Sequence, residues 1–175
     1  MTYFIGLPLP VTCYDKLIRS PFKPVPVEER HLTLLYLGSK SLGEEAIKEL
    51  GEIAGAASRF TLIFEGLKPF PSWSRIRYLA AVPKPNHMLG ELRLSLLRRL
   101  GHLGEDRWEA FKPHVSIAYT RLKTSLQLVE TVEEIVKAAR KVRCMLKTSQ
   151  LAFYSASRGR YHVLKAFPLG FYDTA

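Results

Sequence analysis

The sequence predicts an α+β fold with two pseudo-symmetric lobes, each an antiparallel sheet with helices on its outer face, around a central cleft. Three observations predict it. Apolar segments typical of strands alternate with segments of helical spacing along the 175 residues. Two of the strand segments carry the same short motif, His-x-Thr at His31 and His-x-Ser at His114. Similar elements surround each motif, and the motif positions, 31 and 114, differ by 83.

The length fits one domain over residues 1–175. Within it we expect an internal repeat that covers roughly residues 1–74 and 75–154. Residues 155–175 add a turn and a last strand. The repeat period is too long for a solenoid, whose units have roughly 20 to 50 residues. Two lobes that face each other therefore fit best.

Each half of the chain is predicted to contain strand, helix, histidine strand, helix and strand in that order. Apolar residues at i, i+4, i+7, i+8 and i+11 begin at both Ala46 and Leu128, which indicates one amphipathic helix in each half. A capping-box pattern at Ser41 to Glu44 precedes the first of these two helices. The expected elements are a strand at 2–9, a helix at 11–20, strand 31–38, helix 46–57 and strand 60–67, then strand 75–82, helix 89–100, strand 114–119, helix 128–139, strand region 144–154 and strand 161–167.

The composition favours a polyanionic partner. The chain has 26 lysines and arginines against 16 aspartates and glutamates, a net charge of +10 and a pI near 9.8. RNA is such a partner, although a basic surface can also be simply solvated. No apolar run is long enough to span a membrane, and the first ten residues lack the pattern of a signal peptide. We expect a cytoplasmic protein that does not bind membranes.

The two cysteines, Cys13 and Cys144, have no paired spacing. Neither position fits a zinc knuckle or a redox motif, so buried free thiols are expected. A zinc site is also a poor interpretation of the histidines, because two widely separated imidazoles supply too few ligands.

The paired motifs predict acid-base chemistry. Alternate side chains of a strand point to the same face, so His31 stands beside Thr33 and His114 beside Ser116. Histidine has an ordinary pKa of about 6.5, so one imidazole can accept a proton while a second donates one. A phosphodiester suits such a pair, because the hydroxyls can hydrogen bond its non-bridging oxygens. The scheme requires no metal and no cofactor.

One His-x-Thr motif alone is more often structural, but two at equivalent points of a repeat on a basic chain favour function. The segments around them resemble the two-histidine phosphoesterases, in particular the RNA 2',3'-cyclic phosphodiesterases, also named 2'-5' RNA ligases. The resemblance spans nearly the whole chain and is carried by TYFIGLPLP, HLTLLYLG, FEGLKPFPSWSRIRYLAAV, KPHVSIAY and LAFYSASRGRYHVLKAFPL.

The resemblance implies an enzyme that hydrolyses RNA 2',3'-cyclic phosphate ends to 2'-phosphates, with 2'-5' ligation as the reverse reaction. We expect it to be a monomer. It also implies that His114 activates water and His31 protonates the departing 3' oxygen. One position departs from the family. Many members carry an arginine five residues after the second histidine, where this chain has Tyr119. Arg121 is the nearest basic substitute and is our candidate for phosphate binding, although strand alternation points it away from His114.

Other side chains are candidates for holding RNA. Phe4 and Tyr161 can stack on bases, although aromatic residues in strands more often belong to the core. Two arginine pairs, Arg75 with Arg77 and Arg158 with Arg160, can attract the RNA backbone. Two alternatives stay open. One is an RNA-binding module without turnover, and the other is a cyclic phosphodiesterase of a small nucleotide such as an ADP-ribose cyclic phosphate.

Overall fold

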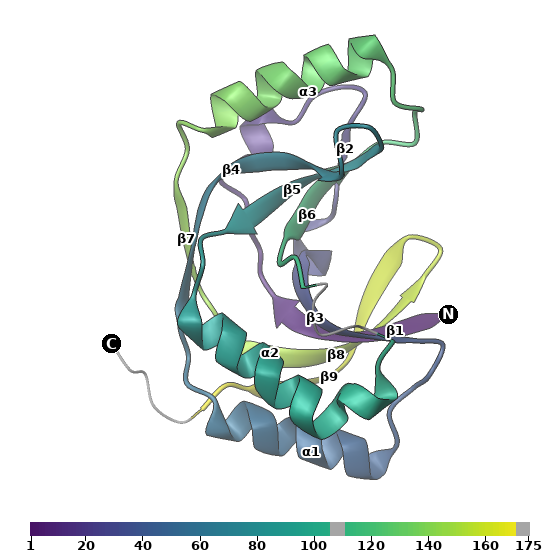
Figure 1. Ribbon diagram of the computed structural model, residues 1–175, viewed down its shortest axis with the longest axis vertical. Coiled ribbons are helices and arrows are strands. Elements are labelled where there is room, and N and C mark those ends of the chain that lie inside the picture. The colour runs from purple at the N-terminus through teal and green to yellow at the C-terminus, as the bar shows by residue number, and fades with distance from the viewer. Residues whose placement is uncertain (106–110, 171–175) are drawn as a thin grey trace.

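A computed structural model describes residues 1–105 and 111–170, and its strands form one antiparallel sheet (Figure 1). The sheet consists of two groups of strands, which we call the first and second half-sheets. The first runs β3-β1-β8-β9 and consists of β1 (Thr2–Pro8), β3 (His31–Gly38), β8 (Gln150–Ser157) and β9 (Arg160–Pro168). The second runs β6-β5-β4-β7, with β2 beside β6, and consists of β2 (Lys23–Pro24), β4 (Thr61–Pro71), β5 (Ile76–Pro83), β6 (Val115–Tyr119) and β7 (Cys144–Lys147).

The two histidine strands are the innermost strands of the two half-sheets. Strand β3 meets β6 at a single registered pair, Leu32 opposite Val115. Outward from this pair, β1 and β5 come next, then β8 and β4, and then β9 and β7. The strand order is therefore mirrored about the pair of histidine strands, and the predicted α+β fold with pseudo-symmetric antiparallel sheets is confirmed.

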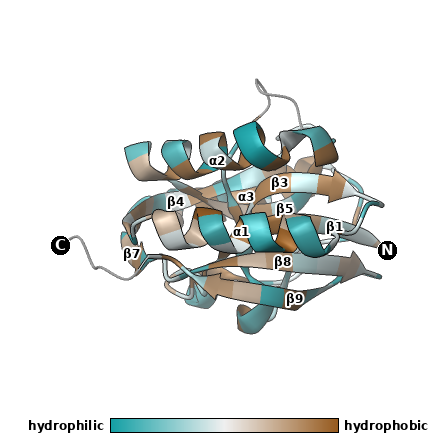
Figure 2. Cartoon of the chain, turned by 90° about the horizontal axis from the view of Figure 1, so that it is seen from below, coloured by the Kyte–Doolittle hydropathy of each residue, from teal (hydrophilic) through white to brown (hydrophobic). Residues whose placement is uncertain are grey.

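In residues 1–105 and 111–170, three α-helices cover the outer faces of the sheet. Helices α1 (Glu44–Ala56) and α2 (His87–Leu100) lie together over the first half-sheet, and α3 (Leu126–Ala139) lies over the second, at the opposite end of the molecule (Figure 1). Hydrophobic and hydrophilic residues alternate along α1 (Figure 2), and its apolar residues face the core. None of the helices in the described parts of the chain is long and apolar enough to span a membrane.

The helix starts follow capping chemistry with one exception. The side chains of Asn86 and Ser125 accept hydrogen bonds from the backbone N–H groups of Leu89 and Leu128, at 3.0 and 3.1 Å. Helix α1 instead begins at Glu44 after Gly43, without a side-chain cap. The capping box predicted from Ser41 is therefore wrong.

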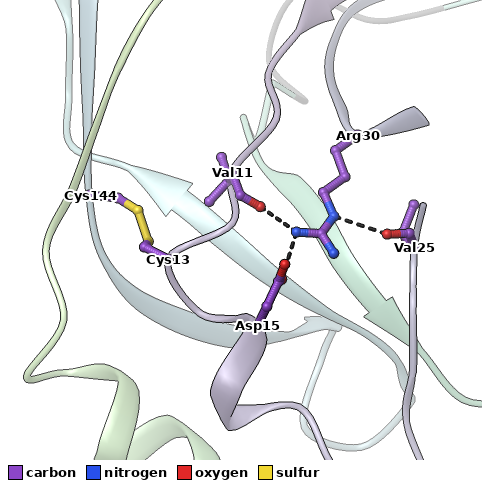
Figure 3. Close-up of polar contacts among 6 residues, drawn as sticks. All are labelled: Val11, Cys13, Asp15, Val25, Arg30 and Cys144. Atoms are coloured by element: carbon purple, nitrogen blue, oxygen red, sulfur yellow. Dashed lines mark hydrogen bonds and ion pairs between the residues drawn. A yellow bond between two sulfur atoms is a disulfide. The ribbon is translucent and has the colours of Figure 1, made fainter. Parts of the chain in front are cut away.

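The helix predicted at residues 11–20 is reduced to a single 3-10 turn, η1 (Asp15–Leu17). The guanidinium group of Arg30 is buried beside it and donates hydrogen bonds to the carbonyl oxygen of Val11, to Asp15 Oδ1 at 2.7 Å and to the carbonyl oxygen of Val25 at 3.0 Å (Figure 3). In an α-helix the Val11 carbonyl would accept from the Asp15 N–H. That N–H instead bonds the Thr12 carbonyl, so packing around Arg30 replaces the helix.

The prediction of free thiols is wrong, because Cys13 and Cys144 form a disulfide (Figure 3). Their Cα atoms are 6.2 Å apart although 131 positions separate them in the sequence. The bond joins the loop after β1 to the first residue of β7. Sequence spacing could not reveal it, because the contact arises only where elements of both halves of the chain pack together.

Each half-sheet takes strands from both predicted repeats, residues 1–74 and 75–154. Strand β4 belongs to the first half by sequence but pairs with β5 and β7 of the second half-sheet. In the other direction, β8 pairs with β1, and α2 packs beside α1. The chain thus crosses between the half-sheets within each repeat, and the fold interlaces the two repeats.

Candidate functional site

The single contact between β3 and β6 places the two motifs together. Leu32 and Val115 face each other and are fully buried, so their neighbours point to the opposite face of the sheet. If the antiparallel register continues by one residue on each side, His31 stands across from Ser116, and Thr33 across from His114. All four side chains line one cavity of about 320 Å³.

Both imidazoles are held in the same way. His31 Nδ1 lies 2.7 Å from the Glu29 carbonyl oxygen, and His114 Nδ1 lies 2.8 Å from the Lys112 carbonyl oxygen. A carbonyl oxygen only accepts, so in each ring the Nδ1 carries the hydrogen and donates it. In each neutral ring this leaves Nε2 with a free lone pair. Each ring is therefore prepared to accept a proton at Nε2, or to donate one from it once protonated.

A phenylalanine ring stacks on each histidine. Phe4 and Tyr154 are registered partners on β1 and β8, and Phe70 and Tyr78 are partners on β4 and β5. The Phe4 ring lies 4.5 Å from the His31 ring, and the Phe70 ring lies 3.8 Å from the His114 ring, both stacked. Sequence reasoning missed Phe70 and Tyr78. Phe70 lies beyond the predicted strand 60–67, because β4 continues to Pro71, whereas Tyr78 lies within the predicted strand 75–82.

The two aromatic residues predicted to stack on RNA lie in different settings. Phe4 is only 4% exposed, because its ring packs between His31 and Tyr154. Tyr161 presents its edge to His31 at a ring distance of 4.7 Å and keeps part of its surface exposed in the cavity wall. Tyr161 is therefore the better placed of the two to meet a base.

Burial lowers the pKa values of both histidines. The pKa of His31 falls to about 4, mainly because burial disfavours the charged ring. The Glu29 carbonyl opposes this shift, and the nearby His114 adds to it. The pKa of His114 is also lowered by burial, against the opposing hydrogen bond to the Lys112 carbonyl. In the free protein both rings are thus neutral at pH 7.

Glu29 connects the histidine support to the β8–β9 hairpin, and sequence reasoning missed it. Its buried carboxylate accepts hydrogen bonds from Arg160 Nε at 2.9 and 3.2 Å and from the Tyr161 N–H at 2.8 Å. Burial raises the pKa of Glu29, but these donors outweigh it, and the net shift is downward. One residue therefore orients His31 through its carbonyl and holds Tyr161 through its side chain.

Arg121 does not line the histidine cavity. It is exposed just beyond the end of β6 and lines a neighbouring groove of about 780 Å³, together with Tyr119. The arginine pairs 75/77 and 158/160 line the same groove. The structure thus gathers the predicted basic residues on one side of the histidines.

Comparison with known proteins shows the family of the chain. The family model of the 2'-5' RNA ligase superfamily matches residues 18–160. The chain belongs to this superfamily. The resemblance found in the motifs is thereby confirmed, and both histidines lie inside the matched residues.

A superfamily relative from Archaeoglobus fulgidus, named RNA 2',3'-cyclic phosphodiesterase, is 31% identical over 106 residues. That alignment covers 59% of this chain and 59% of the relative, so the similarity spans less than two thirds of the relative's length.

Solved structures of the superfamily fold cover nearly the whole chain. A Thermus thermophilus protein has a TM-score of 0.67 at 23% identity, with 98% of this chain and 100% of that chain covered. Escherichia coli LigT in its apo form has a TM-score of 0.61 at 23% identity, with 97% of each chain covered. LigT complexed with 3'-AMP has a TM-score of 0.64 at 20% identity, with 96% and 97% covered. At these identities the likeness shows a shared fold.

Proposed function

We propose that this chain hydrolyses the 2',3'-cyclic phosphate end of RNA to a 2'-phosphate. The observation that carries the proposal is the pair His31 and His114, each with Nδ1 bound to a backbone carbonyl and both lining one cavity with two hydroxyls. The superfamily membership and the name of the archaeal relative support the same activity.

The proposed reaction uses one histidine on each side of the phosphorus. His114 Nε2 accepts a proton from water as the water oxygen attacks the phosphorus. The bond from phosphorus to the 3' oxygen breaks, and protonated His31 gives its Nε2 proton to that oxygen. Thr33 and Ser116 donate hydrogen bonds to the non-bridging oxygens, where negative charge increases in the transition state. With a 5'-hydroxyl in place of water, the same groups form a 2'-5' linkage.

His31 can act as the acid only if the bound substrate raises the pKa of its imidazole. A protonated His31 is disfavoured in the free protein, because its pKa is about 4. A bound phosphodiester places a negative charge beside the ring and raises the pKa of the imidazole. We therefore propose that binding of the cyclic phosphate and protonation of His31 are coupled.

The test uses an RNA oligomer with a 2',3'-cyclic phosphate end and protein treated with EDTA. We expect full turnover to a 2'-phosphate, since the proposed mechanism uses no metal. His31→Ala and His114→Ala should each lower kcat by about 10² to 10⁴-fold, the usual contribution of a positioned acid or base. His102→Ala, at a histidine outside the cavity, is the matched control.

Three results would contradict parts of the proposal. Full activity of both alanine variants would exclude histidine catalysis. A 3'-phosphate product would mean that the 2' oxygen leaves, against the assigned roles. Salt-sensitive RNA binding without any product would favour the non-catalytic binding module.

We further propose that the protein acts as a monomer in the cytoplasm, in keeping with an RNA substrate. Size-exclusion chromatography with light scattering measures the oligomeric state. The Cys13–Cys144 disulfide is unusual for a cytoplasmic protein, because disulfides persist in few cytosolic proteins outside hyperthermophiles.

A further inference from the structure

We propose that Glu29 is a positioning residue of the proposed reaction and that its buried carboxylate acts through His31. The negative charge of the carboxylate keeps the proton of the histidine pair on His31, so that His31 is the acid and His114 stays free to be the base. The inference rests on the proposed function and adds a residue that divides the two roles at the same site.

The two histidines are held so alike that their shared contacts do not decide which ring carries the proton. Each Nδ1 lies against the carbonyl oxygen of the residue two positions earlier, and each ring stacks on a phenylalanine. Each histidine also has a hydroxyl two positions later in the wall of the same cavity. In the proposed reaction the phosphate lies between the rings, so its charge favours protonation of both. The division into acid and base therefore requires a charge that acts on one ring only.

The side chains two positions before the histidines differ in charge and in burial. Glu29 precedes His31 at the end of the 3-10 turn η2 (Val27–Glu29), and Lys112 has the same place before His114. Lys112 is exposed, whereas Glu29 is only 4% exposed and lines the histidine cavity. In residues 1–105 and 111–170, Glu29 is the only residue with a carboxylate in the wall of that cavity. The site thus has a buried negative charge on the side of His31.

Donors on β9 hold the Glu29 carboxylate in place and keep it ionised. Arg160 Nε and the Tyr161 N–H donate hydrogen bonds to it, and a protonated His162 also favours the ionised form. The positive charge of Arg160 opposes the field of the carboxylate, but the Arg160 side chain is 62% exposed, against 5% for Glu29. Water therefore screens the guanidinium more strongly than the carboxylate, and a net negative field remains at His31.

The other titratable groups that the structure places against His31 do not favour its protonation. The rings of Tyr154 on β8 and Tyr161 on β9 lie 5.1 and 4.7 Å from the His31 ring. Burial raises the pKa values of both tyrosines, so both are neutral at pH 7. Burial is the main cause of the low pKa of His31, and the charge of His114 on β6 lowers that pKa further. The charge of Glu29 raises the pKa of His31 and does not act on His114.

The test measures kcat over a range of pH with a 2',3'-cyclic mononucleotide. The basic limb of this profile reports loss of the proton from the acid in the enzyme–substrate complex. Glu29→Gln removes the charge but keeps an amide oxygen that can accept the same hydrogen bonds. We expect its basic limb to move to lower pH by about 0.5 to 1 unit, so that kcat above the limb falls about 3- to 10-fold and kcat at lower pH approaches that of the wild type. Glu28→Gln, the same change at the exposed neighbouring residue, is the matched control.

A second variant separates an effect of charge from the loss of the ion pair. Arg160→Gln breaks the same Glu29–Arg160 pair but removes a positive charge instead of a negative one. Its basic limb should therefore stay in place or move to higher pH. If the pair has only a structural role, both variants should lower kcat by a similar factor at every pH. That result, an unmoved limb in Glu29→Gln, or a limb that moves to lower pH in Arg160→Gln would overturn the inference.

A measurement without turnover separates this inference from the proposed function. Nitrogen NMR chemical shifts of the histidine rings, followed against pH with sulfate in place of the phosphodiester, report the protonation of each ring. His31 should take up its proton at lower pH in Glu29→Gln than in the wild type, and His114 at the same pH in both. Identical His31 titrations would overturn the inference. The expected difference, in a wild type that does not turn over the cyclic mononucleotide, would overturn the proposed function and leave the electrostatic role of Glu29 standing.

Discussion

The two histidines occupy equivalent positions on opposite half-sheets, and the same local device orients both. In each case the carbonyl oxygen two residues earlier accepts the Nδ1 hydrogen, and a phenylalanine ring stacks on the imidazole. This arrangement fixes the tautomer and prevents the ring from turning. The two sites differ in their charge environment, because the negative charge of Glu29 raises the pKa of His31 and does not shift that of His114.

The pH dependence of turnover follows from the lowered pKa values. The active form of the free enzyme carries one proton on the pair, so kcat/KM should be bell-shaped. Both histidine pKa values are below the ordinary 6.5, and that of His31 is about 4. The optimum of kcat/KM should therefore lie between about pH 4 and 6.5 and decline tenfold per pH unit above it. Initial rates on a 2',3'-cyclic mononucleotide measure this.

Folding must be followed in the same pH range. The unfolded chain protonates His31 near pH 6.5 and the folded chain only near pH 4, so this residue makes the protein less stable as pH falls through that window. Circular dichroism at each pH separates loss of fold from loss of activity. A flat kcat/KM from pH 6.5 to 8.5 in folded protein would contradict the prediction.

At the residue scale, His31, Thr33, His114 and Ser116 could be chosen as candidate site residues from the sequence. Each histidine lies two positions from its hydroxyl on one strand face, and the motif occurs twice. The single pair Leu32–Val115 then brings them together. The role of the Glu29 carboxylate was not predictable, since the partners of that side chain are more than 130 positions away.

The predicted helices are present where the residues of the apolar pattern are also the residues that pack in the core. Helices α1, α2 and α3 follow their apolar spacing, because the same residues that define the stripe are buried against the sheet. The segment 11–20 has a similar pattern but no α-helix, because the buried guanidinium of Arg30 takes the Val11 carbonyl. Local spacing cannot show such a distant competitor.

The disulfide should be the strongest single stabiliser at the scale of elements. It closes a loop of 131 positions between the segment after β1 and β7. In the chain-entropy model, loops of this length restrict the unfolded chain by close to 5 kcal/mol, and measured losses on removing a native disulfide are about 2 to 5 kcal/mol. Cys13→Ser with Cys144→Ser should therefore lower the free energy of unfolding by about 2 to 5 kcal/mol in urea denaturation.

The matched comparison is the wild type with and without reductant. Reduction should lower the stability of the wild type toward that of the double variant and leave the variant unchanged. Equal stability of oxidised wild type and double variant would show that the bond contributes nothing.

At the scale of the whole molecule, the pseudo-symmetric α+β fold was predictable, but the sequence did not indicate that each half-sheet takes strands from both predicted repeats. The constant offset between the two motifs indicates that two segments of the chain have the same order of elements. It does not indicate which strands pair, because pairing depends on contacts between those segments. Strand β4 leaves its own repeat to pair with β5, and β8 leaves its repeat to pair with β1. Each half-sheet therefore needs strands from both repeats to bury its core.

This interlacing predicts that the molecule unfolds as one unit. A chain cut after residue 74 gives a first fragment without β8 and β9 and a second fragment without β4. Each fragment lacks a strand that its half-sheet buries, so neither should fold alone, and together they should recover circular dichroism and cyclic phosphodiesterase activity. In the intact chain, urea transitions followed by tryptophan fluorescence and far-ultraviolet circular dichroism should coincide. A folded fragment 1–74, or two separate transitions, would mean that the repeats are independent lobes after all.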